Sequence, residues 1–99
     1  MTIRARRSSG NVFRDLGFSA SESESLRVRS DLMLNLQRLI EERGLTQAQA
    51  AKLLSVTQPR ISDLLRGKIQ LFSVDSLIEM LGRAGAHVSF VIKQRRKVA

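Results

Sequence analysis

The sequence lacks cysteine, so it can form no disulfide, no thiol nucleophile and no cysteine zinc site. It also lacks the run of about 18 apolar residues that a membrane-spanning helix needs, so no membrane partner is expected. No apolar segment follows the basic residues at the N-terminus, and a secretory signal peptide is therefore not expected. These absences leave the cytoplasm as the expected location.

The residue sets that support catalysis are also missing. The sequence has no spaced set of histidine, carboxylate and nucleophile, no metal-ligand spacing and no glycine-rich loop that could cradle phosphates. The one histidine, His87, falls in a segment with strand periodicity and is interpreted as an ordinary strand residue. We therefore expect no enzyme, no metal site and no cofactor.

The formal net charge of +8 is unevenly distributed along the chain. Residues 31–82 carry six acidic and six basic side chains and are neutral as a segment. The excess is +3 over residues 1–30 and +5 over residues 83–99. A nucleic acid would fit this distribution, because basic side chains near phosphates release counterions on binding. A solvated, solubilising surface is the alternative, and charge alone does not decide between them.

Composition and periodicity divide the 99 residues into three parts around one domain. Residues 1–20 are interpreted as a basic flexible arm, disordered over residues 1–11, followed by a hydrophobic strap from Val12 to Phe18. The strap could pack on the first helix or bind a partner. Residues 21–85 have helical periodicity and form the predicted domain. Residues 86–99 read as a strand followed by a basic tail.

Four helices are expected within residues 21–85. The first is long and ends near Arg43, before Gly44, and the next three each begin after a capping Thr46, Thr57 or Ser73. The connector from Lys68 to Phe72 is expected to lie against the core. Apolar residues at helical spacing predict the buried set, which consists of Leu32, Leu36, Leu39, Ile40, Ala50, Leu53, Leu54, Ile61, Leu64, Leu65, Leu77, Ile78 and Leu81.

The second and third helices have the pattern of a helix-turn-helix, in which two helices cross steeply after a short turn. Ala51 is small enough for close approach of the helices, and Val56 would plug the turn. Ile61 and Leu64 would anchor the third helix inward. Ser55 stands where a glycine with positive φ is common, at a cost of roughly 1 kcal/mol that a folded domain tolerates. The motif is therefore predicted from Gln47 to Arg66.

The third helix would present a polar face to solvent. With Ile61 and Leu64 turned inward, a helix of 3.6 residues per turn exposes a set consisting of Pro59, Ser62, Asp63 and Arg66. In a recognition helix, N-terminal residues reach base edges in the major groove. A solvated face, with Asp63 paired to Arg60 or Arg66, is the alternative interpretation.

Particular contacts follow if this helix enters DNA. Gln58 could pair with adenine, Arg60 with guanine, and Asp63 could accept from cytosine. Phosphates are held by helix N-termini and nearby basic or hydroxyl side chains. The candidates for phosphate contacts are Gln47, Thr57 and Lys68.

The segment LTQAQAAKLLSVTQPRISDLLRG, Leu45–Gly67, resembles the Cro/C1-type (XRE) helix-turn-helix family. The resemblance extends over about residues 26–83, and it implies an all-α, lambda-repressor-like domain of four to five helices. The flanks NVFRDLGF and AHVSFVI are similar to those of small HigA-type antitoxins. This similarity implies a nucleoid-associated repressor that binds an operator palindrome as a dimer and neutralises a RelE/HigB-like toxin. A stand-alone XRE-family regulator and a toxin-binding module with little DNA role are the alternatives.

Only one strand pattern is found, from His87 to Lys93, with Val88, Phe90 and Ile92 on its apolar face. A single strand is unstable in water because its backbone groups and its apolar face lack partners. We expect it to pair with a second copy across a two-fold axis, presenting two recognition helices about 34 Å apart. Packing on the helices, pairing near Val12 or pairing with another protein are the alternatives.

Overall fold

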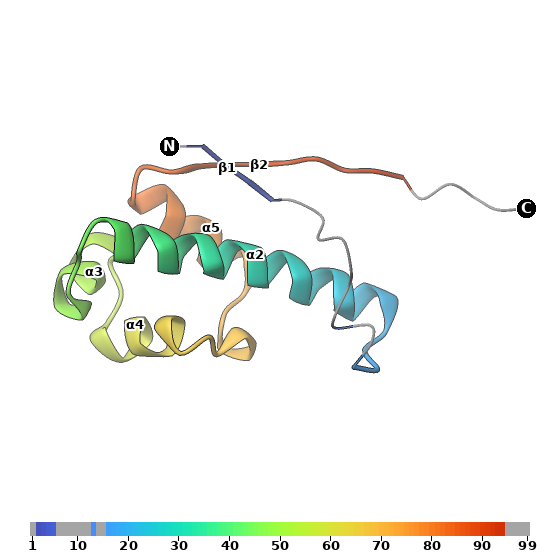
Figure 1. Cartoon of the computed structure of the whole chain (residues 1–99), viewed down its shortest axis with the longest axis horizontal. Coiled ribbons are helices and arrows are strands. Elements are labelled where there is room, and N and C mark those ends of the chain that lie inside the picture. Colours follow the sequence, from blue (N-terminus) through green and yellow to red (C-terminus); the bar gives the residue numbers. More distant parts are fainter. Residues whose placement is uncertain (1, 6–12, 14–15, 95–99) are drawn as a thin grey trace, which may run out of the picture.

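The computed structural model describes residues 2–5, 13 and 16–94, with the backbone alone given for residues 2–5. In this part of the chain, four α-helices and a short 3-10 turn are accompanied by two strands. The elements in chain order are β1 (Thr2–Ala5), α2 (Ala20–Glu42), α3 (Gln47–Leu54), α4 (Gln58–Leu65), η1 (Ile69–Leu71), α5 (Val74–Arg83) and β2 (His87–Phe90). Helix α2 runs through the middle of the molecule, with α4 on one side and the two strands on the other (Figure 1). The predicted all-α domain is confirmed.

Helices α3, α4 and α5 each begin at the hydroxyl cap that the sequence predicts. The side chains of Thr46, Thr57 and Ser73 each accept a hydrogen bond from the backbone N–H three residues later. At Thr46 the bond is reciprocal, because the Gln49 side chain accepts from the Thr46 N–H at 2.9 Å. Gly44, with φ of +62°, ends α2 in the left-handed conformation that glycine adopts without strain.

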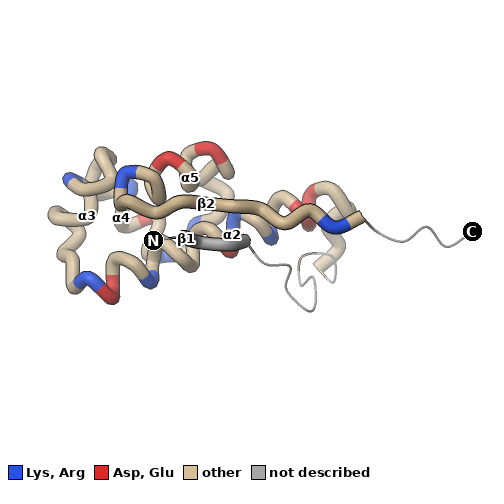
Figure 2. The backbone as a smooth tube through the Cα atoms, turned by 90° about the horizontal axis from the view of Figure 1, so that it is seen from above, with Lys and Arg blue, Asp and Glu red and all other residues tan. Residues whose placement is uncertain are grey.

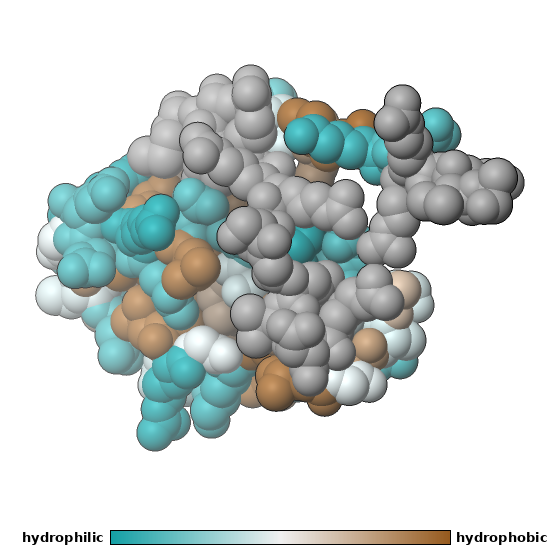
Figure 3. Space-filling model, turned by 45° about the vertical axis from the view of Figure 1, so that its right-hand side comes forward, coloured by the Kyte–Doolittle hydropathy of each residue, from teal (hydrophilic) through white to brown (hydrophobic). Residues whose placement is uncertain are grey.

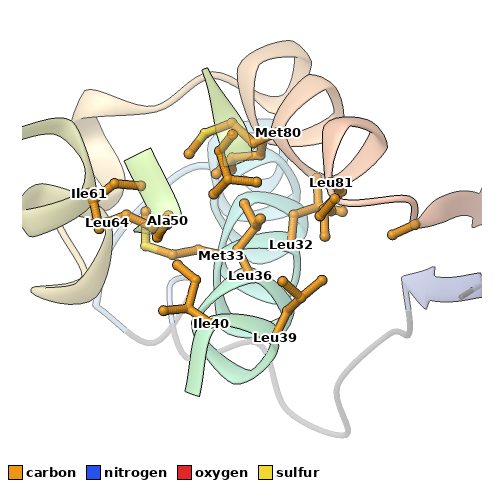
Figure 4. Packing of buried hydrophobic residues seen from close by; sticks show 14 of the residues in the cluster. Leu32, Met33, Leu36, Leu39, Ile40, Ala50, Ile61, Leu64, Met80 and Leu81 are labelled. Carbon is orange, nitrogen blue, oxygen red and sulfur yellow. The ribbon is translucent and has the colours of Figure 1, made fainter. Parts of the chain in front are cut away.

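The four helices enclose one hydrophobic core, part of which is seen closely in Figure 4. Side chains from every helix are fully buried in it, namely Leu32, Leu36, Leu54, Ile61, Leu64, Leu77 and Leu81. Of the predicted core, Leu53 and Ile78 are only partly buried. The prediction for Leu65 was wrong, since its side chain is 38% exposed. Helix α4 has only two turns, and Ile61 and Leu64 already fill the face that meets the core.

The strand prediction needs a correction. β1 and β2 pair in parallel within the chain, with Thr2 opposite His87 and Ala5 opposite Phe90. The expectation of a single strand was therefore wrong, because residues 2–5 form the second strand. The segment TIRA is too short and too polar to stand out from a basic arm, and it becomes a strand beside β2. One edge of β2 is thus satisfied without a second copy.

The C-terminal strand is also shorter than predicted, since it ends at Phe90 rather than Lys93. Val88 packs against the core, whereas Phe90 is 46% and Ile92 is 91% exposed. Beyond Phe90 the chain runs away from the helices (Figure 1), and hydrophobic side chains show on this projecting segment in Figure 3. The predicted apolar face is therefore divided, with one residue partly buried and two exposed.

Candidate nucleic-acid interface

The turn between α3 and α4 has the predicted helix-turn-helix geometry. Ser55 adopts the left-handed conformation, with φ of 57° and ψ of 44°, as its place in the motif indicated. The Val56 N–H donates to the Ala51 carbonyl at 3.0 Å and closes the end of α3. Ala51 is 6% exposed and Val56 packs against the core, so both serve the predicted steric roles.

Two contacts that sequence reasoning missed hold this motif on the rest of the domain. The Arg83 guanidinium, at the end of α5, lies 3.4 Å from the Ser55 hydroxyl. The Gln37 side chain of α2 donates from Nε2 to the Leu64 carbonyl of α4 at 2.8 Å. That carbonyl lies in the last turn of α4 and also accepts from the backbone N–H of Gly67 at 3.1 Å. The motif is therefore tied to α5 at its turn and to α2 at its end.

The predicted contact residues lie along α4, its two flanks and the start of α3. Gln47 is the first residue of α3, and Gln58 is the first residue of α4. Within the set, the exposed residues are Gln47, Thr57, Gln58, Pro59, Arg66 and Lys68, and the partly buried ones are Arg60, Ser62 and Asp63. The Thr57 hydroxyl is engaged as a helix cap, because it accepts from the Arg60 N–H at 3.3 Å.

Asp63 forms an ion pair within the structure. Its Oδ1 lies 3.4 Å from the Lys68 Nζ, and the Lys68 N–H also donates to the Asp63 carbonyl at 3.1 Å. The alternative interpretation paired Asp63 with Arg60 or Arg66, but the ion pair that the structure shows is with Lys68. The chain turns back after α4 and brings Lys68 to the carboxylate. A partly exposed pair of this kind contributes at most about 1 kcal/mol to stability, so it can open.

Arg60 is turned toward the protein's own backbone. Its Nη1 donates to the Leu71 carbonyl at 2.7 Å, and its Cζ lies 3.9 Å from the centre of the Phe72 ring. Phe72 is 2% exposed, as the predicted packing of this connector requires, whereas Leu71 is 50% exposed. The side chain expected to seek guanine thus contacts the segment that follows α4.

The charges around the motif match the neutral composition of residues 31–82. Figure 2 shows basic and acidic positions interspersed over the helices. Among the described residues, no group of three or more histidine, cysteine or acidic side chains could hold a metal ion. No helix in this part of the chain has the length and hydrophobicity to cross a membrane.

The crossing of α3 and α4 around Ala51 and Val56 defines a helix-turn-helix domain. A family model described as a helix-turn-helix domain matches residues 12–93, and the chain belongs to that family. A solved structure named as an XRE-family transcriptional regulator is 31% identical, with a TM-score of 0.71. That similarity covers 79% of this chain and 91% of the other, which places this chain in the XRE family. No curated protein matches the chain.

Proposed function

We propose that the protein is a sequence-specific transcriptional repressor that inserts α4 into the major groove of DNA. The observation that carries this proposal is the division of α4 into two faces. Ile61 and Leu64 are fully buried on one face, while Gln58 and Arg66 are exposed on the other. A helix that is fixed by its buried face can present side chains to base edges in a defined register.

Within this proposal the exposed residues of the motif take separate roles. Gln58 and Arg66 are long polar side chains that can reach bases or phosphates from α4. Gln47 and Thr57 stand at the N-termini of α3 and α4, where backbone N–H groups favour phosphate oxygens. Lys68 can leave Asp63 for a phosphate. The XRE-family structure to which the chain is similar is named as a transcriptional regulator, in line with this assignment.

We also propose that the protein acts as a homodimer through the segment that follows β2. The pairing with β1 ends at Phe90, and the next residues carry exposed apolar side chains. Val91 is 56% and Ile92 is 91% exposed, which is unfavourable in water unless another surface covers them. A second copy of the same segment, antiparallel to the first, would bury both sets and relate two α4 helices by a two-fold axis.

A finer proposal is that the repressor is the antitoxin of a toxin–antitoxin operon. It rests on the similarity of the segments NVFRDLGF and AHVSFVI to HigA-type antitoxins. The described part of the strap adds an exposed apolar side chain, since Leu16 is 70% exposed beside Phe13 and Phe18, whose rings meet edge to face. A RelE/HigB-like toxin would be the protein that covers it. A stand-alone XRE-family regulator is the second candidate.

A selection from randomised DNA duplexes tests the central proposal. The protein should enrich one palindromic sequence, and its affinity for that sequence should fall steeply as salt rises. Gln58→Ala and Arg66→Ala should weaken binding, whereas Arg38→Ala, a matched change on the outer face of α2, should leave it close to the wild-type value. Equal affinity for all duplexes would contradict sequence-specific binding.

A further inference from the structure

We propose that Arg60 is a positioning residue that locks α4 onto the η1 segment, and that it does not read a base. This inference rests on the proposed DNA-binding function and assigns the residues of α4 that carry its specificity. It replaces the expectation that Arg60 pairs with guanine. The residues of α4 that distinguish one DNA sequence from another are then Gln58, Ser62 and Arg66.

The first argument is the way in which the guanidinium is used. Its flat face covers the Phe72 ring, with 3.9 Å between Cζ and the ring centre, and its edge donates to the Leu71 carbonyl at 2.7 Å. Guanine recognition requires two N–H groups of an arginine to point together at the O6 and N7 atoms. Arg60 would have to leave both of its partners to reach a base. Phe72 cannot follow it, because the ring is 2% exposed within the core.

The second argument is that the same short segment is fixed from two helices. The Leu71 carbonyl accepts from Arg60 of α4, and the adjacent Phe72 carbonyl accepts from Nη1 of Arg29 of α2 at 3.5 Å. Neither carbonyl belongs to a continuing α-helix, so each benefits from a side-chain donor. The segment Leu71–Phe72 is therefore bonded to both helices, and it helps to fix the position of α4 relative to α2.

The third argument is that the two ends of α4 are held by separate contacts. Gln37 holds the Leu64 carbonyl in the last turn, and Arg60 holds the first turn against Leu71 and Phe72. With both ends fixed, α4 has a defined tilt relative to α2. Loss of Arg60 would release the first turn, which carries Gln58. The expected consequence is weaker binding to every sequence, with no change in which sequence is preferred.

The test compares Arg60→Ala with Phe72→Leu, which removes the ring while leaving Arg60 in place, and with the double variant. Each protein is put through selection from randomised duplexes, then titrated with the wild-type consensus at several salt concentrations. Thermal unfolding without DNA is measured in parallel. Gln58→Ala serves as the matched control for a residue that reads a base. Arg60→Lys keeps the charge without the planar face and replaces Arg60→Ala if that variant does not fold.

We expect both single variants to keep the wild-type consensus while losing about ten-fold in affinity, as in a loss of one charged hydrogen bond or ring contact. Their effects on thermal unfolding should be less than additive in the double variant, because they remove the same contact. The consensus should change only for Gln58→Ala. The slope of log affinity against log salt should stay the same for Phe72→Leu and Arg60→Lys.

Three results would overturn the proposal. Relaxed preference at one base position for Arg60→Ala but not for Phe72→Leu would make Arg60 a base reader. A salt slope reduced by about one for Arg60→Ala, with no effect of Phe72→Leu, would make it a phosphate contact. Additive effects on unfolding would show that Arg60 and Phe72 are not coupled. If the wild-type protein enriches no sequence, the DNA-binding proposal fails, while the unfolding measurement still tests the contact.

Discussion

Gln37 of α2 and Leu64 of α4 are joined by a hydrogen bond of 2.8 Å from the side-chain amide to the backbone carbonyl. The carbonyl is in the last turn of α4, and Gln37 lies on the face of α2 that turns toward it. The bond adds a side-chain donor to a carbonyl that also accepts from the Gly67 N–H at 3.1 Å. It connects the longest helix of the domain to the one that is proposed to enter DNA.

Gln37→Met should lower the free energy of unfolding by about 0.5–1.5 kcal/mol, because it removes one side-chain hydrogen bond at nearly unchanged volume, while the Leu64 carbonyl still accepts from the Gly67 N–H. The measurement is chemical denaturation, with Gln70→Met as the matched change at an exposed glutamine of η1. An equal effect of the two substitutions would show that the bond contributes nothing specific.

Ser55→Gly should raise the free energy of unfolding by up to about 1 kcal/mol, because glycine adopts φ of 57° without steric cost. The gain is offset in part by the lost contact with Arg83 and by the greater freedom of glycine in the unfolded chain. Ser55→Ala separates these effects, since it removes the hydroxyl and keeps the strain. Thermal unfolding should therefore rank the glycine variant above serine, and serine above alanine. A glycine variant less stable than the wild type would show that the Ser55 contact with Arg83 and the entropy of the unfolded chain outweigh the relief of strain.

Asp63→Asn should strengthen binding to all DNA duplexes. It removes a negative charge from the face of α4 and frees Lys68, now 3.4 Å away, to meet a phosphate. The salt dependence of affinity should become steeper, with the slope larger by about one. Glu79→Gln makes the same charge change on α5 and should have a smaller effect. A loss of preference at a single base pair, without a general gain in affinity, would instead assign Asp63 to cytosine.

Ile92→Lys should convert the proposed dimer into a monomer. The side chain is 91% exposed in the single chain, so the change should not lower its thermal stability, whereas a charge within a paired strand interface is unfavourable. Analytical ultracentrifugation checks the mass, and Gln94→Lys controls for the added charge at a neighbouring exposed position. An unchanged dimer would place the interface elsewhere on the domain.

The pH dependence of stability should include a contribution from Asp31. Burial raises the pKa of its carboxyl above the ordinary value, and the positive charge of Arg27 lowers it in part. The folded state then holds the proton to higher pH than the unfolded state, so this contribution to stability falls as pH rises from the ordinary pKa through the raised one. Asp31→Asn lacks this dependence. Denaturation curves between pH 3 and pH 7 should show the stability of the variant rising relative to wild type across that window; a constant difference would contradict the shift.

Local features of this chain could be predicted from its sequence because they depend on neighbours in the chain. The caps at Thr46, Thr57 and Ser73, and the left-handed Ser55, follow from residues within one turn. The family resemblance read from Leu45–Gly67 and the all-α fold are confirmed for the same reason. Helix α4 has only eight residues, too few for the spacing of its apolar side chains to define the buried face, and Leu65 was consequently assigned to the wrong face.

The contacts that orient the motif were not predictable because they join residues distant in sequence. Nothing near Gln37 indicates that it meets Leu64, and nothing near Arg60 distinguishes a guanine reader from a partner of Phe72. The pairing of β1 with β2 was missed for the same reason, because it joins residues near the two ends of the described chain. Periodicity reports which face of an element is buried, but not which element covers it.

The pairing of Thr2 with His87 also has a consequence for the order in which the chain folds. Closing a loop that contains all four helices costs conformational entropy. The four residue pairs of the two strands contribute too little free energy to offset this cost until the helices hold the two ends of the chain together. The helical core should therefore assemble first, and the strand pair last. In hydrogen exchange, the backbone amides of β1 should therefore exchange much faster than those of α2 around the buried Leu36.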